Sequence, residues 1–325
     1  MPANLTPQYK NAEALYKAAR TIEDKISALE EMYSTIPKHK GTEKLRADIK
    51  QRLSKARKQL DQSSRSTKKG ISFHMQREGA AQIVLVGPPN SGKSSLINGF
   101  TNANAVVADY PFTTQKPLPG MFQWENVQFQ LIDLPPLSDE FFEPWIPSLV
   151  RVCDMALIVV AVDSIDQLDT VLRILNDAKI SLVPSYTEAD YHARTVKIPA
   201  LIALTKMDLP DAETSLELLR ESFDQLPIIT LSSHNPGDGQ KLGRHIFEML
   251  ALVRVYTKAP GQEPNMHQPV VLRQGSTLLD VTSEIHKDFA DEMKFARVWG
   301  SGKFDGQKVQ RDYIVQEGDI FEFKT

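Results

Sequence analysis

The sequence contains little cysteine and no long apolar run. Cys153 is the one thiol among 325 residues, which excludes an internal disulfide and a cysteine-based metal site. It lies next to a strand that reads as buried, so we interpret it as a structural thiol. The longest apolar stretch, residues 155–162, is far shorter than the roughly 20 residues that a bilayer-spanning helix needs. The first ten residues lack the apolar core of a signal peptide. These absences predict a cytoplasmic protein.

Charge is nearly balanced over the whole chain but is distributed unevenly. The formal net charge is -3, whereas residues 38–69 contain twelve Lys or Arg residues against three acidic ones and carry a net charge of +9. A basic concentration of this kind predicts contact with a polyanion such as RNA. The competing interpretation is the solvated face of a helix, and both interpretations remain open at this point.

The chain is long enough for more than one hydrophobic core, and the spacing of its apolar residues changes along its length. Helical spacing of apolar residues over positions 6–60 gives way to short apolar runs that alternate with helical patterns, which is typical of a largely parallel sheet covered by helices. We predict a helical region at 1–62, a linker at 63–80, an α/β domain at 81–258, a linker at 259–267 and a small mixed domain at 268–325. The strands predicted in the α/β domain are 82–86, 117–123, 127–132, 155–162, 198–204 and 227–231, with a hairpin turn at Glu125–Asn126.

The stretch GPPNSGKSS at 87–95 follows an apolar strand and precedes a helical run. Its spacing, Gly-x-x-x-x-Gly-Lys-Ser, is that of the P-loop, in which backbone N–H groups at a helix N-terminus surround phosphate oxygens. Lys93 adds a positive charge, and the Ser94 hydroxyl is suited to bind Mg²⁺. The predicted phosphate-binding residues are Gly87, Asn90, Ser91, Gly92, Lys93, Ser94 and Ser95.

The stretch TKMD at 205–208 ends another apolar strand and predicts the base. The Asp208 carboxylate can accept hydrogen bonds from N1–H and the exocyclic amine of guanine, whereas adenine lacks the N1–H donor and leaves the carboxylate unpaired. Thr205 precedes it, and we expect Lys206 to lie along the base. Ser232 and Ser233 follow the next strand, where a backbone amide can reach the guanine oxygen. The sequence therefore predicts GTP or GDP as the ligand.

Together with two further stretches, these motifs resemble a known family. GPPNSGKSS, DYPFTTQKPLPG, LIDLPPL, TKMD and LSS are similar to motifs of the Obg-like translation-associated GTPases, and they are closest to the developmentally regulated GTP-binding branch. The C-terminal stretch from GSTLLDV to DIFEF looks like the TGS domain of that branch. The resemblance implies an α/β P-loop GTPase domain with a mostly parallel sheet, preceded by a helical region and followed by a small β-grasp domain.

The resemblance also implies roles for single residues. Thr114 matches the switch I threonine that binds Mg²⁺ and senses the γ-phosphate, and Asp133 matches the acid that holds Mg²⁺ through water. Asn90 occupies the position that helps to bind K⁺ in cation-activated relatives, where a cation offsets charge that builds up between the phosphates. A residue that simply tolerates the geometry of the loop is an equally open interpretation of Asn90. The implied metal residues are Ser94, Thr114 and Asp133, and the implied catalytic residues are Lys93, Thr114 and Asn90.

Two positions depart from the family pattern. Pro136 replaces the glycine of D-x-x-G, whose amide donates to the γ-phosphate, and proline has no N–H to donate. Losing a hydrogen bond to a charged oxygen costs roughly 1.5–3 kcal/mol, which would reduce discrimination between GTP and GDP about tenfold to a hundredfold. Leu137 stands where many GTPases have a water-orienting glutamine, a feature shared with the apolar-substituted GTPases that the chain resembles. The resemblance therefore implies slow hydrolysis that depends on a cation or a partner.

Two hypotheses of function follow. The first is a Mg²⁺-dependent GTPase that acts as a nucleotide-controlled switch. It would contact the ribosome or structured RNA through residues 38–69 and the TGS-like domain, and a protein activator would stimulate it. We expect neither a membrane nor a specific DNA sequence as its partner. The second hypothesis is a guanine-nucleotide-binding scaffold with weak switching and little hydrolysis, which Pro136 and Leu137 favour.

Overall fold

The computed structural model describes residues 9, 16, 22–36, 49–50, 52–53, 75–101, 117–140, 142–187, 194–285 and 293–324. The chain divides into two compact units, Met1–Ser72 and Phe73–Thr325. In the first unit, helix α2 (Ile22–Thr35) lies where the apolar spacing predicts a helix. Its buried Leu29 and Met32 pack with Tyr9 and Ile49 in one small core. Most of the basic segment 38–69 lies outside the described residues.

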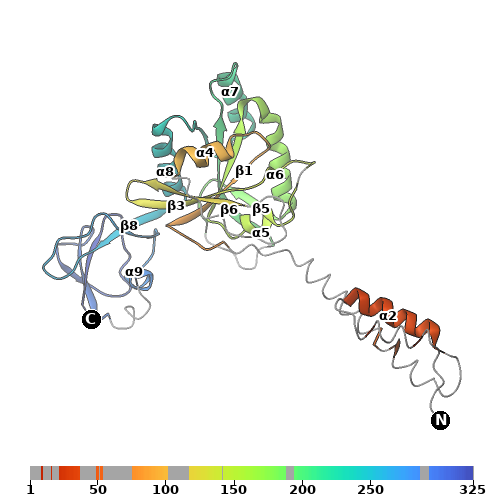
Figure 1. Cartoon of the computed structure of the whole chain (residues 1–325). Coiled ribbons are helices and arrows are strands. Elements are labelled where there is room, and N and C mark those ends of the chain that lie inside the picture. The colour runs from red at the N-terminus through yellow and green to blue at the C-terminus, as the bar shows by residue number, and fades with distance from the viewer. Residues whose placement is uncertain are drawn as a thin grey trace, which may run out of the picture. The chain divides into compact units, whose positions relative to one another are not determined.

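The second unit contains a seven-stranded sheet (Figure 1). Its strands are β1 (Ala81–Val86), β2 (Leu118–Trp124), β3 (Val127–Asp133), β4 (Met155–Ala161), β5 (Ile180–Val183), β6 (Val196–Thr205) and β7 (Ile228–Thr230). The order is β2-β3-β1-β4-β6-β5, with β7 paired to β6, and the β2–β3 hairpin turns at the predicted residues 125–126. The other pairs are parallel. Strand β5 was not predicted from the sequence, because a run of four residues directly after a helical pattern gives no separate signal.

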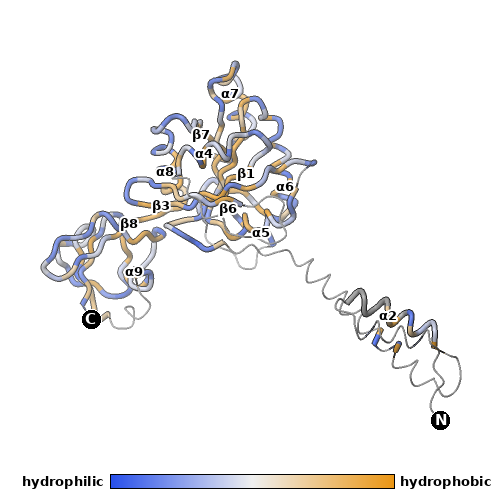
Figure 2. Tube along the Cα trace, viewed as in Figure 1, coloured by the Kyte–Doolittle hydropathy of each residue, from blue (hydrophilic) through white to orange (hydrophobic). Residues whose placement is uncertain are grey.

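Helices cover both faces of this sheet. One core receives α4 (Lys93–Phe100) and α8 (Pro236–Met249). The other receives α5 (Ile146–Val150), α6 (Leu168–Asp177) and α7 (Ala212–Ser222), and the short 3₁₀ helix η2 (Val162–Gln167) connects β4 to α6. Strands buried on both faces need apolar residues at successive positions, and Figure 2 shows hydrophobic colour along β1 and β6. In the described parts of the chain, no helix is long and apolar enough to cross a membrane.

Cys153 belongs to the core that includes α5 and α6. Burial, with a smaller contribution from the neighbouring Asp154 carboxylate, raises the pKa of its thiol to about 12. The thiol therefore stays protonated and unreactive at neutral pH, as expected for a structural cysteine.

A second sheet of five strands has the order β11-β10-β12-β8-β9. Its elements are β8 (Leu252–Thr257), β9 (Val270–Arg273), helix α9 (Leu278–Ile285), β10 (Phe295–Trp299), β11 (Gln307–Val309) and β12 (Ile320–Lys324). Strand β8 lies inside the range that the sequence analysis gave to the α/β domain, so that boundary is corrected to about residue 250. The sequence does not reveal this boundary, because β8 is as rich in apolar residues as the end of α8. The segment rich in proline and glycine begins only after β8.

Arg254 of β8 joins the two sheets. Its guanidinium donates to Glu125 at the tip of the β2–β3 hairpin (2.5 Å) and to Glu317 of the second domain (2.7 Å). Its Cζ atom also lies 5.6 Å from the centre of the Trp124 ring and 5.2 Å from the centre of the Phe247 ring. The side chain is 18% exposed, so both carboxylates are held by a largely buried cation, and the hairpin is coupled to the small domain.

Candidate nucleotide-binding site

The loop between β1 and α4 has a backbone that specific residues require. A Cβ at Gly87 would lie 2.0 Å from the carbonyl oxygen of Val159 on β4, so only glycine fits. Gly92 caps α4 with φ of 91°, and Asn90 has φ of 57°. Both angles lie in the left-handed region, which glycine adopts freely and asparagine adopts more readily than most residues. The geometric interpretation of Asn90 is therefore sufficient by itself to explain that residue.

Lys93 folds back over the loop. Its Nζ donates to the carbonyl oxygens of Pro88 (2.8 Å) and Gly87 (3.1 Å) and to Ser91 Oγ (3.3 Å). The residue is 7% exposed, and burial lowers its pKa to about 8, although the nearby Asp133 carboxylate acts in the opposite direction. Phosphate oxygens in the loop would offer this ammonium charged acceptors in place of neutral carbonyls, which would stabilise its charged form.

Ser94 at the start of α4 meets Asp133 at the end of β3. Ser94 Oγ donates to Asp133 Oδ2 at 2.5 Å, whereas Asp133 Oδ1 is buried and has no hydrogen-bond partner within the described residues. Burial raises the pKa of Asp133, while the Ser94 hydroxyl and the Lys93 charge oppose that rise. An unpaired buried carboxylate oxygen calls for a ligand, and hydroxyl and carboxylate oxygens are donors that Mg²⁺ accepts. The two residues therefore fit Mg²⁺.

The remaining Mg²⁺ ligands would not come from a protein cage. Among the described residues there is no group of three or more His, Cys, Asp or Glu side chains that could hold a metal. Mg²⁺ commonly takes one or two protein oxygens together with phosphate oxygens and water. Thr114, the other expected metal residue, lies outside the described residues.

Thr205 connects the phosphate loop to β6. Its hydroxyl is buried and donates to the Ser91 carbonyl oxygen at 2.7 Å, so Thr205 holds the loop rather than the base. Lys206 has φ of 57°, and its Nζ pairs with Asp163 of η2 at 3.1 Å. Asp208 is exposed two residues further on, beyond the carboxyl end of β6. Ligands of parallel α/β sheets bind at this edge, which also carries the P-loop.

Ser232 and Ser233 follow β7 and approach α4 closely. A Cβ at Gly99 of α4 would lie 2.6 Å from the Ser233 carbonyl oxygen. The Ser232 amide donates to Asp238 Oδ2 at 2.8 Å and is therefore occupied, which leaves Ser233 as the better candidate for the guanine oxygen. Asp238 was not predicted from the sequence. Asn235 caps α8 by accepting from the Gly237 amide, and an acid three residues after such a cap was a signal that could have identified it.

The segment after Asp133 is fixed to β1 and to the phosphate loop. The Leu134 amide donates to the Leu85 carbonyl oxygen (3.4 Å), and the Leu137 amide donates to the Gly87 carbonyl oxygen (3.0 Å). Residues 135 and 136 are prolines, so residues 134–137 offer no free amide to a γ-phosphate. The Leu137 side chain is 1% exposed and packs in the core with α5. Leu137 is thus a packing residue. The sequence showed only that leucine replaces the glutamine of many GTPases, and it did not show this role.

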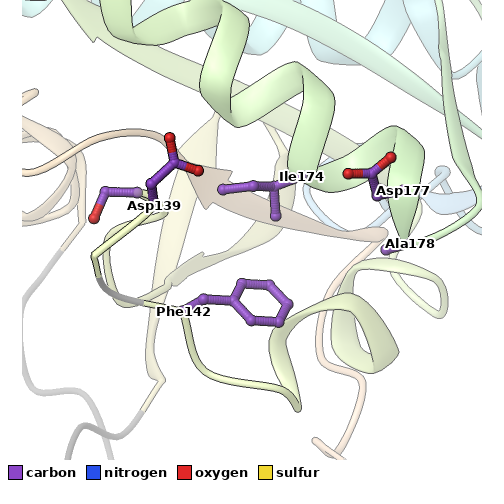
Figure 3. A pocket seen from close by; sticks show the side chains of 6 residues that line it. Asp139, Phe142, Ile174, Asp177 and Ala178 are labelled. Atoms are coloured by element: carbon purple, nitrogen blue, oxygen red, sulfur yellow. The ribbon is translucent and has the colours of Figure 1, made fainter.

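Beyond Leu137, the chain forms one wall of a pocket of about 420 Å³ (Figure 3). Phe142 lies across the pocket from Ile174 of α6, and Asp139 and Asp177 lie at its rim. Arg173 pairs with both of these carboxylates and offsets part of their charge. We assign this pocket no part in nucleotide binding.

Comparisons with known proteins match two parts of the chain to family models. Residues 82–188 match the family model described as 50S ribosome-binding GTPase, and residues 253–325 match the TGS domain model. The chain is 27% identical to developmentally-regulated GTP-binding protein 1 of Xenopus laevis, covering 92% of this chain and 97% of the relative. It is 26% identical to ribosome-interacting GTPase 1 of Saccharomyces cerevisiae, covering 92% and 98%. The solved structure of the Schizosaccharomyces pombe YchF GTPase is 13% identical with a TM-score of 0.49, covering 77% of this chain and 99% of that one.

Proposed function

We propose that this chain, whose residues 82–188 match a GTPase model and whose residues 253–325 match the TGS domain model, hydrolyses GTP to GDP and phosphate. The observation that carries the proposal is the Ser94–Asp133 pair beside Lys93, with the buried Asp133 Oδ1 left unpaired. These three side chains come from the P-loop and from the end of β3, so they would surround the terminal phosphates of a bound nucleotide. Asp208 would select guanine.

Residues of this chain would contribute mainly by positioning and charge. Lys93 would move from the loop carbonyls to the β- and γ-phosphate oxygens, and Ser94 and Asp133, together with Thr114, would hold Mg²⁺. When bound, Mg²⁺ supplies positive charge to the phosphate oxygens. Asn90 is proposed to help hold K⁺ beside them. The Leu137 side chain is apolar and buried and cannot orient water, so we expect slow intrinsic hydrolysis that a cation or a protein activator increases.

Single-turnover GTP hydrolysis in KCl and in NaCl tests this proposal. We expect measurable phosphate release with Mg²⁺, faster in KCl, and loss of at least a hundredfold in Lys93→Ala. If Asn90→Ala still hydrolysed GTP faster in KCl than in NaCl, the proposed role of Asn90 in holding K⁺ would be refuted, and the proposal of GTP hydrolysis would stand. Failure of the native protein to bind GTP at all would refute the proposal.

The proposed setting is the ribosome in the cytoplasm. Support comes from the name of the yeast relative, from the match to the TGS domain and from the +9 charge of residues 38–69. Replacing Lys50, Arg52, Lys55 and Arg57 by glutamate is expected to weaken cosedimentation with ribosomes and to flatten its dependence on salt, because phosphate contacts release counterions. Unchanged cosedimentation would discard the RNA role of this segment.

A second candidate, a guanine-nucleotide-binding scaffold with little switching, is favoured by the segment 134–137. With two prolines and two occupied amides, this segment cannot sense the γ-phosphate through its backbone. Calorimetry with GDP and a non-hydrolysable GTP analogue separates the candidates, since a scaffold binds both equally. In Pro136→Gly, a restored amide is expected to favour the GTP analogue by about tenfold or more.

A further inference from the structure

The loop after β7 offers one backbone amide that the protein itself does not use. Four of the five amides of residues 231–235 donate to the Leu204 carbonyl oxygen (2.9 Å), Asp238 Oδ2 (2.8 Å), Ser232 Oγ (3.3 Å) and the Ser232 carbonyl oxygen (3.2 Å). The fifth is the amide of Ser233, which has no hydrogen-bond partner within the part of the chain that the structure describes. Ser233 is half-buried, so this loop presents a single N–H donor at a defined place.

Asp238 holds the loop from the first turn of α8. Its Oδ2 accepts from the Ser232 amide, and its Oδ1 accepts from Asn235 Nδ2 at 3.2 Å. Its own amide donates to the Asn235 carbonyl oxygen at 3.0 Å. The helix N-terminus stabilises the charge of a carboxylate at this position. Asp238 therefore occupies the Ser232 amide and fixes both ends of the turn that contains Ser233.

Helix α4 contacts the same turn. A Cβ at Gly99 would lie 2.6 Å from the Ser233 carbonyl oxygen and 2.9 Å from the Ser233 Cβ, so Ser233 can approach α4 this closely only because residue 99 is glycine. The helix begins at Lys93 of the phosphate loop, about 9 Å from Gly99 along the helix axis. One rigid helix thus connects the phosphate loop to the turn that presents the free amide.

We propose that Asp238 and Gly99 are positioning residues for guanine selectivity, because they hold the Ser233 amide where it donates to guanine O6. The inference rests on the proposed function. Guanine carries an acceptor at its 6-position, whereas adenine carries an amino donor there. A fixed N–H would pair with guanine but would face a second donor in adenine, which leaves both groups unpaired. This selection is separate from that of Asp208, which would bind N1–H and the 2-amino group.

The probe that isolates this contact is 6-thioguanosine diphosphate. It keeps the two donors that Asp208 would bind and replaces O6 by sulfur, which is a weak acceptor. Competition titrations with the full chain would give the ratio of its dissociation constant to that of GDP. For the native protein we expect GDP to bind about twofold to tenfold more tightly, the effect of one hydrogen bond.

Asp238→Ala should lower this ratio to about 1, because the turn and its free amide are no longer held. Asp238→Asn keeps one oxygen for the Ser232 amide and should retain part of the preference. Asp280→Ala is the matched control, because Asp280 of α9 also accepts from a backbone amide at the start of its helix, that of Thr277 at 2.7 Å. The control should keep the native ratio.

Gly99→Ala tests the same positioning from α4. The added Cβ should displace Ser233 and lower the ratio, and alanine favours a helix more than glycine does, so an unstable α4 would not explain the loss. Gly239→Ala in α8 is its control, since a Cβ there would meet no atom nearer than one of Phe100 at 3.5 Å. In the native protein, GDP should also slow hydrogen exchange of the Ser233 amide, and this effect should be lost in Asp238→Ala.

A ratio of 1 in the native protein, or a native ratio in Asp238→Ala or in Gly99→Ala, would overturn the inference. The Gly99→Ala measurement decides the matter if Asp238→Ala does not fold. The GDP titration of the native protein keeps this inference apart from the proposed function. If the native protein bound no GDP, the proposed function would be refuted, whereas tight GDP binding with a ratio of 1 would refute only the positioning of Ser233.

Discussion

Thr205→Val removes one buried hydroxyl with almost no change in shape. Thr205 is 5% exposed, and its Oγ1 donates to the carbonyl oxygens of Ser91 (2.7 Å) and Val160 (3.3 Å). Ser91 is fully buried, so its carbonyl oxygen would lose this donor in a place that water does not reach. Leaving a buried acceptor unsatisfied costs about 1–3 kcal/mol.

The cost should appear mainly as weaker nucleotide binding, because Ser91 lies inside the loop that we propose receives the phosphates. A loss of 1–3 kcal/mol corresponds to GDP affinity reduced about fivefold to a hundredfold. Thr205→Ser retains the hydroxyl and should stay within about threefold of the native protein. Titration with a fluorescent GDP analogue measures the affinity, and urea unfolding of the same three proteins measures stability.

Native GDP affinity and an unchanged urea midpoint in Thr205→Val would refute this reasoning. A different pattern would also contradict it: if Thr205→Val discriminated against guanine relative to other bases, Thr205 would contact the base directly. The structure predicts that both variants keep the native preference for guanine, because the hydroxyl reaches the loop and not the base.

Asp208→Asn should weaken GDP binding about a hundredfold or more and should improve xanthosine diphosphate binding, since an amide can donate to the xanthine oxygen; competition titration measures both. Because the Lys93 pKa is lowered to about 8, its ammonium is lost as pH rises through 8, and GDP binding without Mg²⁺ at pH 8 should take up about half a proton. Calorimetry in buffers of different ionisation enthalpy detects this uptake, and Lys93→Arg should show none, because arginine stays charged. Arg254→Ala should lower the free energy of unfolding by about 1–2 kcal/mol and increase hydrogen exchange in β8. The control Arg244→Ala, at an exposed position, should change the free energy of unfolding by less than about 0.5 kcal/mol. If β8 exchanged hydrogen at the same rate in the two variants, the coupling of the two domains through Arg254 would be contradicted.

The phosphate loop could be predicted from the sequence because its determinants are contiguous. Gly87 and Gly92 set the backbone, Lys93 and Ser94 follow at fixed spacing, and strand and helix patterns flank them. The same holds for the position of TKMD at the end of β6 and for the β2–β3 hairpin, whose short turn joins neighbouring strands. Local backbone requirements and the periodicity of apolar residues are written in consecutive positions, so they can be read without knowing what packs against them.

Contacts between distant residues were decided by the tertiary structure alone. The Leu137 amide reaches Gly87 and the Thr205 hydroxyl reaches Ser91 only because the sheet brings β3, β1 and β6 to one edge. Strand β8 belongs to the second sheet because it pairs with β9 and β12, while its own sequence would suit either domain. Burial of the Asp133 carboxylate and the close approach of Ser233 to Gly99 have the same origin. Burial and long-range pairing depend on the whole fold, and no short stretch of residues encodes them.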